Sequence, residues 1–314
     1  MESSQAHTPH FARGLVCALA GGALWGFSGS CAQLMFTHYT VAPLWMVSVR
    51  MSLGAVLMIA VAVAFAWRAG NTKRILTPMK NGRAAARVVA FALLGLGFTQ
   101  LTYLESINSS NAGTATVLEY IGPVLIVALV CVRERRAPHA REICAVACVV
   151  AGTFFLATHG DPTQLVLSPQ ALFWGLLSAI SMIFYTLIPE PLMKTYDNFS
   201  VLAWAMLIGG VLMLAVVRPW TVPVDIDAVG WLALVGGLIV LGTVGAFILY
   251  FQGIKDAGPS RASMLASVEV VSATLLSVLW LGTPFTLMDL VGLLLIMSTV
   301  FLLAKRDEQT TQPI

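Results

Sequence analysis

One serine lies in surroundings that could support nucleophilic catalysis. Gly26-Phe27-Ser28-Gly29 fits G-x-S-G, a pattern seen around the nucleophiles of proteases that cut inside membranes. Such a serine needs a base within hydrogen-bond reach, usually a histidine on another helix. No histidine or lysine falls within a long apolar run of this chain. We therefore expect Ser28 to be an ordinary helix residue, and we expect no catalytic residues and no enzyme activity.

Three charged residues lie deep within apolar runs, Arg50, Glu119 and Glu269, and Glu105 lies near the outer end of another. A charge inside a bilayer is costly, so it usually faces a cavity or a partner. Arg50 and Glu119 lie at similar depths, and they form either a structural ion pair or a site where Glu119 binds a cation or a proton. Glu269 has no obvious partner at its depth, about 15 Å from one end of its run at the helical rise. It is predicted either to couple transport to protons or to be a protonated side chain hydrogen-bonded between helices. Glu105 is predicted to be a solvated residue at the mouth or a part of the charge network.

Aromatic residues occur at depths similar to those of the carboxylates. An aromatic face beside a carboxylate suits a quaternary ammonium or other organic cation, and it also suits an amphipathic or aromatic amino acid. Packing and contact with lipid are the alternative roles for each ring. Together with Glu119, the residues predicted to bind a solute are Trp25, Tyr103, Tyr120, Tyr185 and Tyr250.

Apolar runs long enough to cross a bilayer account for most of the chain. The 314 residues are 58% hydrophobic and 11% charged, whereas a soluble domain carries about 25% charged residues. About 20 apolar residues in a helix span a hydrocarbon core of about 30 Å. The chain is predicted to be an all-α membrane protein with ten spans, at about 14–36, 43–66, 86–105, 112–132, 142–158, 169–189, 199–217, 229–251, 260–281 and 286–304.

The Lys and Arg residues are concentrated in the loops on one side of the membrane. If the N-terminus is cytoplasmic, 16 of the 18 Lys and Arg residues fall on the cytoplasmic side, Arg218 falls outside and Arg50 lies within a span. Cytoplasmic loops are enriched in Lys and Arg, so both termini are predicted to be cytoplasmic, in a multi-pass plasma (inner) membrane protein. The basic loops are read as this topology signal, and no nucleic-acid partner is expected.

The sequence repeats itself at an offset of 147 residues. "YLESINSSNAGTATVLEY" (103–120) aligns with "YFQGIKDAGPSRASMLAS" (250–267) at this offset, and "GAVLMIAV" (54–61) aligns with "GGVLMLAV" (209–216) at an offset of 155. This predicts two repeats, residues 1–160 and 161–314, with five spans each. An odd number of spans inverts the second repeat relative to the first, which is an architecture of transporters.

These segments resemble the EamA group of the drug/metabolite transporter superfamily. The similarity is carried by "WGFSGS" (25–30), "SVRMSLGAVL" (48–57), "YLESINSSNAGTATVLEYIGPVLI" (103–126), "YFQGIKDAGPSRASML" (250–265) and "LLSVLWLG" (275–282). The chain departs from the pattern at Glu269-Val270, where the counterpart of Pro123 is missing, and at Thr283, where an acidic residue is frequent. "WGFSG" and "NAGTATVLEY" are also similar to bacterial choline and amine permeases. The resemblance implies ten helices in two repeats, with a cavity lined by the first, third, fourth, sixth, eighth and ninth.

The predicted function is therefore that of a secondary transporter for a small organic metabolite, such as an amino acid or an amine or choline-like cation. Alternating access would move the solute, with proton coupling or exchange as open alternatives, and a homodimer is left open. A receptor or scaffold without transport is the competing function. No P-loop occurs in the sequence, so ATP drive within the chain is unsupported. No metal and no cofactor are predicted.

Overall fold

The computed structural model describes residues 10–310, and all regular structure within that range is helical. In a bilayer every backbone amide must find its partner inside the protein, and a helix provides those partners locally. Residues 1–9 and 311–314, the two ends that the charge pattern assigns to the cytoplasm, lie outside the described residues.

The helices divide into two series, which we call the first half (residues 11–158) and the second half (residues 169–310). The first half contains α1 (Phe11–His38), α2 (Pro43–Arg68), η1 (Thr72–Leu76), α3 (Thr77–Lys80), α4 (Gly82–Ala90), η2 (Phe91–Gly97), α5 (Phe98–Ser109), α6 (Ala112–Glu119), α7 (Gly122–Arg133) and α8 (Ala140–Thr158). The second half contains α9 (Pro169–Leu187), α10 (Glu190–Thr195), α11 (Asn198–Val217), η3 (Pro219–Thr221), α12 (Ala228–Trp231), η4 (Leu232–Gly245), α13 (Ala246–Ala257), α14 (Pro259–Ala266), α15 (Val268–Leu279) and α16 (Leu287–Thr310).

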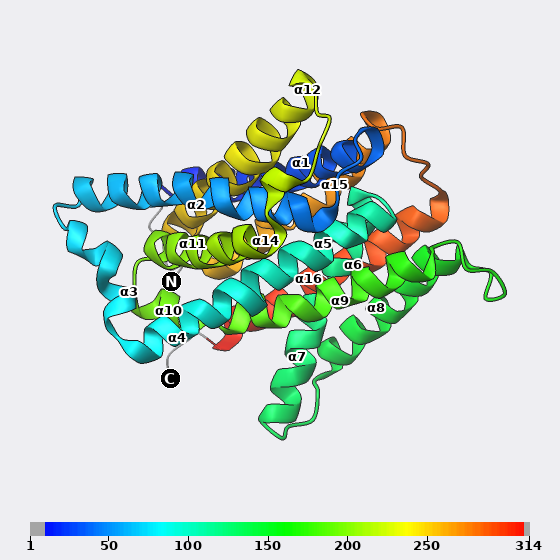
Figure 1. The fold of residues 1–314 in the computed structure, drawn as a ribbon. Helices are drawn as coiled ribbons and strands as arrows, with labels where there is room; N and C mark the ends of the chain where they lie inside the picture. Colours follow the sequence, from blue (N-terminus) through cyan, green and yellow to red (C-terminus); the bar gives the residue numbers. More distant parts are fainter. Residues whose placement is uncertain (1–9, 311–314) are drawn as a thin grey trace.

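The predicted apolar runs all coincide with helices. Within residues 10–310, nine helical segments are long and apolar enough to cross a membrane, and Leu287–Leu303 is a shorter apolar helix. We call the end of the molecule where α1 begins and α2 ends the basic end, and the end where α1 stops the opposite end. Figure 1 shows α2 and α11 side by side, and α8 beside α16.

The internal repeat is visible in the irregular features as well as in the spans. The 3₁₀-helices η1 and η3 begin at Thr72 and Pro219, which are 147 residues apart. The third and eighth spans each contain a π-helical stretch, η2 and η4, immediately before α5 and α13. Stretches of this kind are rare in proteins as a whole, and those that occur often lie at functional sites. The two halves therefore share departures from regular α-helix at matching positions.

The fourth and ninth spans are both interrupted. The fourth is broken at Tyr120 and Ile121, between α6 and α7, just before Pro123. The ninth is broken at Ser267, between α14 and α15, although no proline lies near this point. The offset of 147 carries Tyr120 onto Ser267, so the two breaks are equivalent.

The first span of each half packs against the broken span of the other half. In α1, a Cβ on Gly26 would lie 2.0 Å from the Ser272 Oγ and 2.5 Å from the carbonyl oxygen of Glu269. In α9, a Cβ on Gly175 would lie 2.3 Å from Leu118 Cδ1 in α6. Small residues are what permit such close approach between membrane helices. Both breaks are thereby enclosed by helices from both halves.

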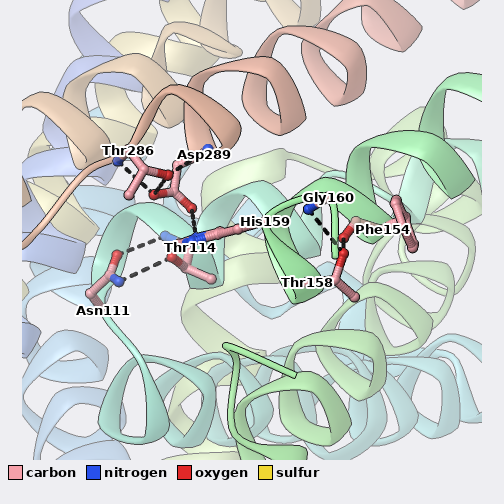
Figure 2. A network of polar contacts seen from close by, with 8 residues as sticks. All are labelled: Asn111, Thr114, Phe154, Thr158, His159, Gly160, Thr286 and Asp289. Atoms are coloured by element: carbon pink, nitrogen blue, oxygen red, sulfur yellow. Dashed lines mark hydrogen bonds and ion pairs between the residues drawn. The ribbon is translucent and has the colours of Figure 1, made fainter. Parts of the chain in front are cut away.

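The last spans of the two halves, α8 and α16, also pack together. At the opposite end, His159 Nε2 lies 3.1 Å from Asp289 Oδ1. Asp289 also accepts a hydrogen bond from the backbone amide of Thr286 at 2.8 Å. Figure 2 shows the His159 ring and the Asp289 carboxylate directed toward one another from the two halves. This contact ties the end of α8 to the start of α16.

Candidate functional site

Glu119 is the last residue of α6, at the break in the fourth span, and its side chain is 8% exposed. Its Oε1 accepts a hydrogen bond from the Ser178 hydroxyl of α9 at 3.2 Å. A buried carboxylate needs such partners because its desolvation is costly. Glu119 in the first half is thus held by a side chain of the second half.

Glu269 lies in the first turn of α15, just past the break in the ninth span. Its Oε2 accepts a hydrogen bond from the Tyr120 hydroxyl at 3.3 Å. This partner could not be predicted from the sequence, because Tyr120 and Glu269 are 149 residues apart. This carboxylate of the second half is therefore held by a side chain of the first half.

Arg50 is 8% exposed and points toward the same region from α2. Its Nε donates to the Thr243 hydroxyl of η4 at 3.1 Å, and its charge acts on both Glu119 and Glu269. Within residues 10–310 Arg50 is joined to neither carboxylate by an ion pair. We call Arg50, Glu119 and Glu269 the charged cluster; within residues 10–310 its guanidinium is hydrogen-bonded to Thr243 and its carboxylates to Ser178 and Tyr120.

Three aromatic rings pack together between α1 and α13: Trp25, Phe247 and Tyr250. The Trp25 ring lies 5.3 Å from the Phe247 ring and 5.0 Å from the Tyr250 ring, centroid to centroid. Trp25 immediately precedes Gly26, whose missing side chain brings α1 against Glu269 of α15. The structure therefore brings the predicted residues Trp25 and Tyr250 together, next to the segment that carries Glu269.

Tyr103 and Tyr185 line the same interior from α5 and α9. The Tyr103 hydroxyl shares a 2.7 Å hydrogen bond with Thr116 in α6, and the Tyr185 ring lies 6.0 Å from that of Phe91. Both rings interact electrostatically with Arg50. Tyr103 is thus joined to α6, the helix that ends at Glu119, and Tyr185 lies on α9, the helix that carries Ser178.

Two sequence candidates lie apart from it. Glu105, in α5, is partly buried, and within the described chain no hydrogen bond or ion pair links it to the charged cluster. Ser28 is 2% exposed and packs against η4, where a Cβ on Gly242 would lie 2.1 Å from Ser28 Cβ. The close contact places Ser28 in the packing between α1 and η4.

Sequence reasoning missed a polar network around Gln33 near the opposite end. The Gln33 Oε1 accepts from the Ala112 amide at 2.9 Å and from the Ser277 hydroxyl at 2.7 Å. Its Nε2 donates to the Thr283 hydroxyl at 2.8 Å. One amide side chain therefore joins α1, the start of α6 and the end of α15. The only signal was an uncharged polar residue inside an apolar run.

The comparisons with known proteins agree with this arrangement. The EamA-like transporter family matches residues 12–158 and, a second time, residues 169–305. The chain belongs to the EamA-like transporter family. It is a multi-pass membrane transporter built from two EamA repeats. Its partners are a small-molecule solute and the lipid bilayer.

This EamA protein is similar to individual proteins in sequence and in fold. It is 35% identical over 292 residues to YicL of Salmonella typhimurium, an uncharacterized inner membrane transporter, and the match covers 93% of this chain and 95% of YicL. A crystal structure of another protein superposes with a TM-score of 0.59 at 17% identity, covering 95% of this chain and 99% of that one. The latter similarity shows the fold alone.

Proposed function

We propose that this EamA family member is a secondary transporter for a small organic solute with an ammonium group, such as an amino acid or an amine or choline-like cation. One observation carries the proposal: Glu119 and Glu269 lie at the breaks of two discontinuous spans, beside an arginine that pairs with neither. In membrane transporters, solute sites are typically formed where discontinuous helices meet at the interface of inverted repeats.

Each part of the site has a role in binding such a solute. The carboxylates would accept hydrogen bonds from the ammonium group, and the faces of Trp25 and Tyr250 would attract its positive charge. For an amino acid, the Arg50 guanidinium would bind the carboxylate as a planar fork. With two carboxylates and one guanidinium, the charged cluster has an excess of negative charge. This excess favours a solute with net positive charge or a zwitterion accompanied by a proton.

Orientation and alternating access form the second part of the proposal. The charge distribution favours a cytoplasmic basic end, and the similarity to the inner membrane transporter YicL supports a plasma (inner) membrane location. The first half would rock against the second about the charged cluster, opening it to one side at a time. The Gln33 network, which joins both halves at the opposite end, would have to separate in the outward-open state.

We assign proton coupling to Glu269, with solute exchange as the alternative. A carboxylate that alternately binds a proton and faces the solute site can link the two movements. The Tyr120 hydroxyl gives Glu269 a partner that can remain when the proton leaves, because a phenol both donates and accepts hydrogen bonds.

The proposal is tested with the purified full-length protein. Thermal unfolding is measured with amino acids, amines, choline and nucleosides, because a ligand that binds the folded state raises the melting temperature. The stabilising compound is then tested for flux in liposomes with and without a pH gradient. Flux of an ammonium compound is expected; binding without flux would point to a receptor instead.

The coupling assignment has a separate test. Glu269→Gln is expected to remove the dependence of flux on the pH gradient, while Glu105→Gln, which changes a carboxylate outside the cluster, leaves it intact. A Glu269→Gln protein whose flux still follows the pH gradient would overturn the assignment. Exchange would be supported if flux required solute on both sides of the membrane.

A further inference from the structure

A second concentration of charge lies at the basic end, away from the carboxylates. It is formed by the end of α2 together with η1, α3 and α4, a segment that we call the basic platform. No Asp or Glu occurs between Arg68 and Leu104. Six exposed cations lie on the platform: Arg68, Lys73, Arg74, Lys80, Arg83 and Arg87.

These cations are unpaired. Among the described residues, none of the six makes an ion pair. The other basic loop at this end differs, because Arg136 binds Glu142 at 2.8 Å and Glu134 at 3.0 Å. The nearby helix α10, which contacts α4, has an acid in Glu190, but Glu190 pairs with Lys194 of the same helix. The positive charge of the platform is thus available to an external anion.

The backbone of the platform is held against the helices. The Trp204 indole of α11 donates to the Ile75 carbonyl oxygen at 2.8 Å, and Pro78 is buried. The Asn81 side chain caps α4 by accepting hydrogen bonds from the amides of Arg83 and Ala84. The cations therefore project from an ordered surface, which reduces the entropy lost on binding.

The fold does not require these charges. The equivalent segment of the second half, beginning with η3, forms the same kind of 3₁₀ turn at the offset of 147. That segment contains Arg218 but also Asp225 and Asp227. Since the turn forms without a cluster of cations, the six cations have a role other than shaping it.

Exposed apolar side chains adjoin the cations. Trp67 is 74% exposed and Leu76 is 51% exposed. Tryptophan is enriched at the level of lipid headgroups, and basic clusters next to a span attract anionic lipids. A soluble anion would make no use of Trp67 and Leu76, whereas a phospholipid offers a phosphate and acyl chains together. We propose that the basic platform is a binding site for anionic phospholipid headgroups.

The test compares two triple variants of equal charge in the full-length protein. Lys73→Gln/Arg74→Gln/Lys80→Gln removes three cations of the platform. Arg133→Gln/Arg135→Gln/Arg141→Gln removes three exposed cations from the loop between α7 and α8 and its flanking residues at the same end. Melting temperatures in phosphatidylcholine nanodiscs check that both variants are folded. Retained phosphatidylglycerol is then counted by native mass spectrometry and titrated by thermal shift.

The platform variant is expected to bind phosphatidylglycerol more weakly by about fivefold for each cation removed, on the order of a hundredfold for three. The loop variant should bind it like the unchanged protein. Equal losses in both variants, or none in either, would overturn the proposal. So would equal stabilisation by free glycerol phosphate, which lacks acyl chains, or tighter binding of a short oligonucleotide than of the lipid.

Discussion

The fourth and ninth spans share a break but differ in where the acid lies. In the fourth span, Glu119 ends α6, on the near side of the break. In the ninth, Glu269 lies in the first turn of α15, on the far side of the break. At the offset of 147, the counterpart of Glu119 is Ala266 and the counterpart of Glu269 is Gly122. The repeat has therefore kept the irregular backbone while the acidic side chains have diverged.

The hydrogen bonds of the two carboxylates are reciprocal between the halves. Glu119 binds Ser178 of the second half, and Glu269 binds Tyr120 of the first half. A movement of one half against the other would change both contacts at once. The symmetry of the fold thus supplies a coupled pair of contacts from chemically different residues.

The helix ends give the two acids different electrostatic surroundings. Glu119 lies at the C-terminal end of a half-helix, where the backbone dipole is negative and disfavours a carboxylate. Glu269 lies at the N-terminal end of another, where the dipole is positive and favours one. An incoming positive charge is consequently stabilised more by Glu119 than by Glu269, which makes Glu119 the stronger candidate for direct contact with an ammonium group.

The largest expected effect is the loss of solute binding in Glu119→Gln. A hydrogen bond to a charged group contributes about 1.5–3 kcal/mol, so affinity should fall between about tenfold and a hundredfold, and by less in Glu269→Gln. Isothermal calorimetry or ligand-dependent thermal shift measures both. If Glu269→Gln weakens binding more than Glu119→Gln does, the roles given to the two spans are reversed.

The second effect concerns the helices that pack on the two breaks. In Gly26→Ala the new Cβ would meet the carbonyl oxygen of Glu269 at 2.5 Å, which is backbone and cannot turn aside. In Gly175→Ala it would meet Leu118 Cδ1 at 2.3 Å, which a rotamer change can move, and Leu118 Cβ at 2.9 Å, which requires only a small shift of the helices. Overpacking costs about 1–3 kcal/mol. Gly26→Ala should therefore lower the melting temperature more than Gly175→Ala, and equal losses would contradict the rigid contact.

The third effect removes the reciprocal hydrogen bonds but keeps the carboxylates. Both bonds are long, at 3.2 and 3.3 Å, and therefore weaker than a usual hydrogen bond to a charged group. Ser178→Ala and Tyr120→Phe should each cost about 1 kcal/mol, which is about fivefold in solute affinity. Because each bond crosses between the halves, the double variant should depart from additivity if the contacts are coupled. Strictly additive losses would show that the two spans act independently.

The smallest expected effect concerns the residues that cap α4 and α12, the short helices that follow the two equivalent loops. The neutral Asn81 caps α4, whereas Asp227 caps α12 and also accepts a hydrogen bond from the Tyr39 hydroxyl. This hydroxyl, together with the Gly230 amide, holds the pKa of Asp227 below its ordinary value of 3.8. The stabilisation is therefore present above about pH 4 and is lost as the pH falls through the lowered pKa.

The caps are compared by recording melting temperatures from pH 5 to pH 3. The acid-induced decrease should be slightly shallower in Asp227→Asn than in the unchanged protein. Asn81→Asp, the matched substitution in the first half, should make it steeper. An Asp227→Asn protein with an unaltered pH profile would remove Asp227 as a source of acid sensitivity.

The sequence contained enough information to place the spans and the repeat. Apolar length marks a membrane helix regardless of its neighbours, and the offset of 147 depends only on residue order. The break in the fourth span was not predicted, although Pro123 lies just after it. The break in the ninth span could not be predicted, because it lies at a serine and no proline marks it. The Ser267 hydroxyl donates to the Met264 carbonyl oxygen at 2.6 Å. Serine makes such local bonds in many helices without interrupting them.

The candidate site was predictable in its residue types but not in its pairings. The depths of Arg50, Glu119 and Glu269 follow from counting along each run. Their partners do not, because Ser178, Tyr120 and Thr243 come from other helices whose rotation depends on packing. Gln33 was missed for the same reason: an uncharged amide in an apolar run gives little indication of how many helices it joins.

The π-helical stretches η2 and η4 have a consequence for where the tyrosines point. Each widened turn holds more residues than an α-turn, so it changes the rotational phase of everything that follows in its span. Tyr103 follows η2 and Tyr250 follows η4, 147 residues apart. Deleting one residue from either stretch would turn the following helix by about 100°, carrying that tyrosine away from the charged cluster while leaving the span long enough to cross the membrane. The direction of these two side chains therefore depends on the number of residues in η2 and η4 more than on their types. Inserting or deleting a single residue there can change the direction, whereas most substitutions cannot.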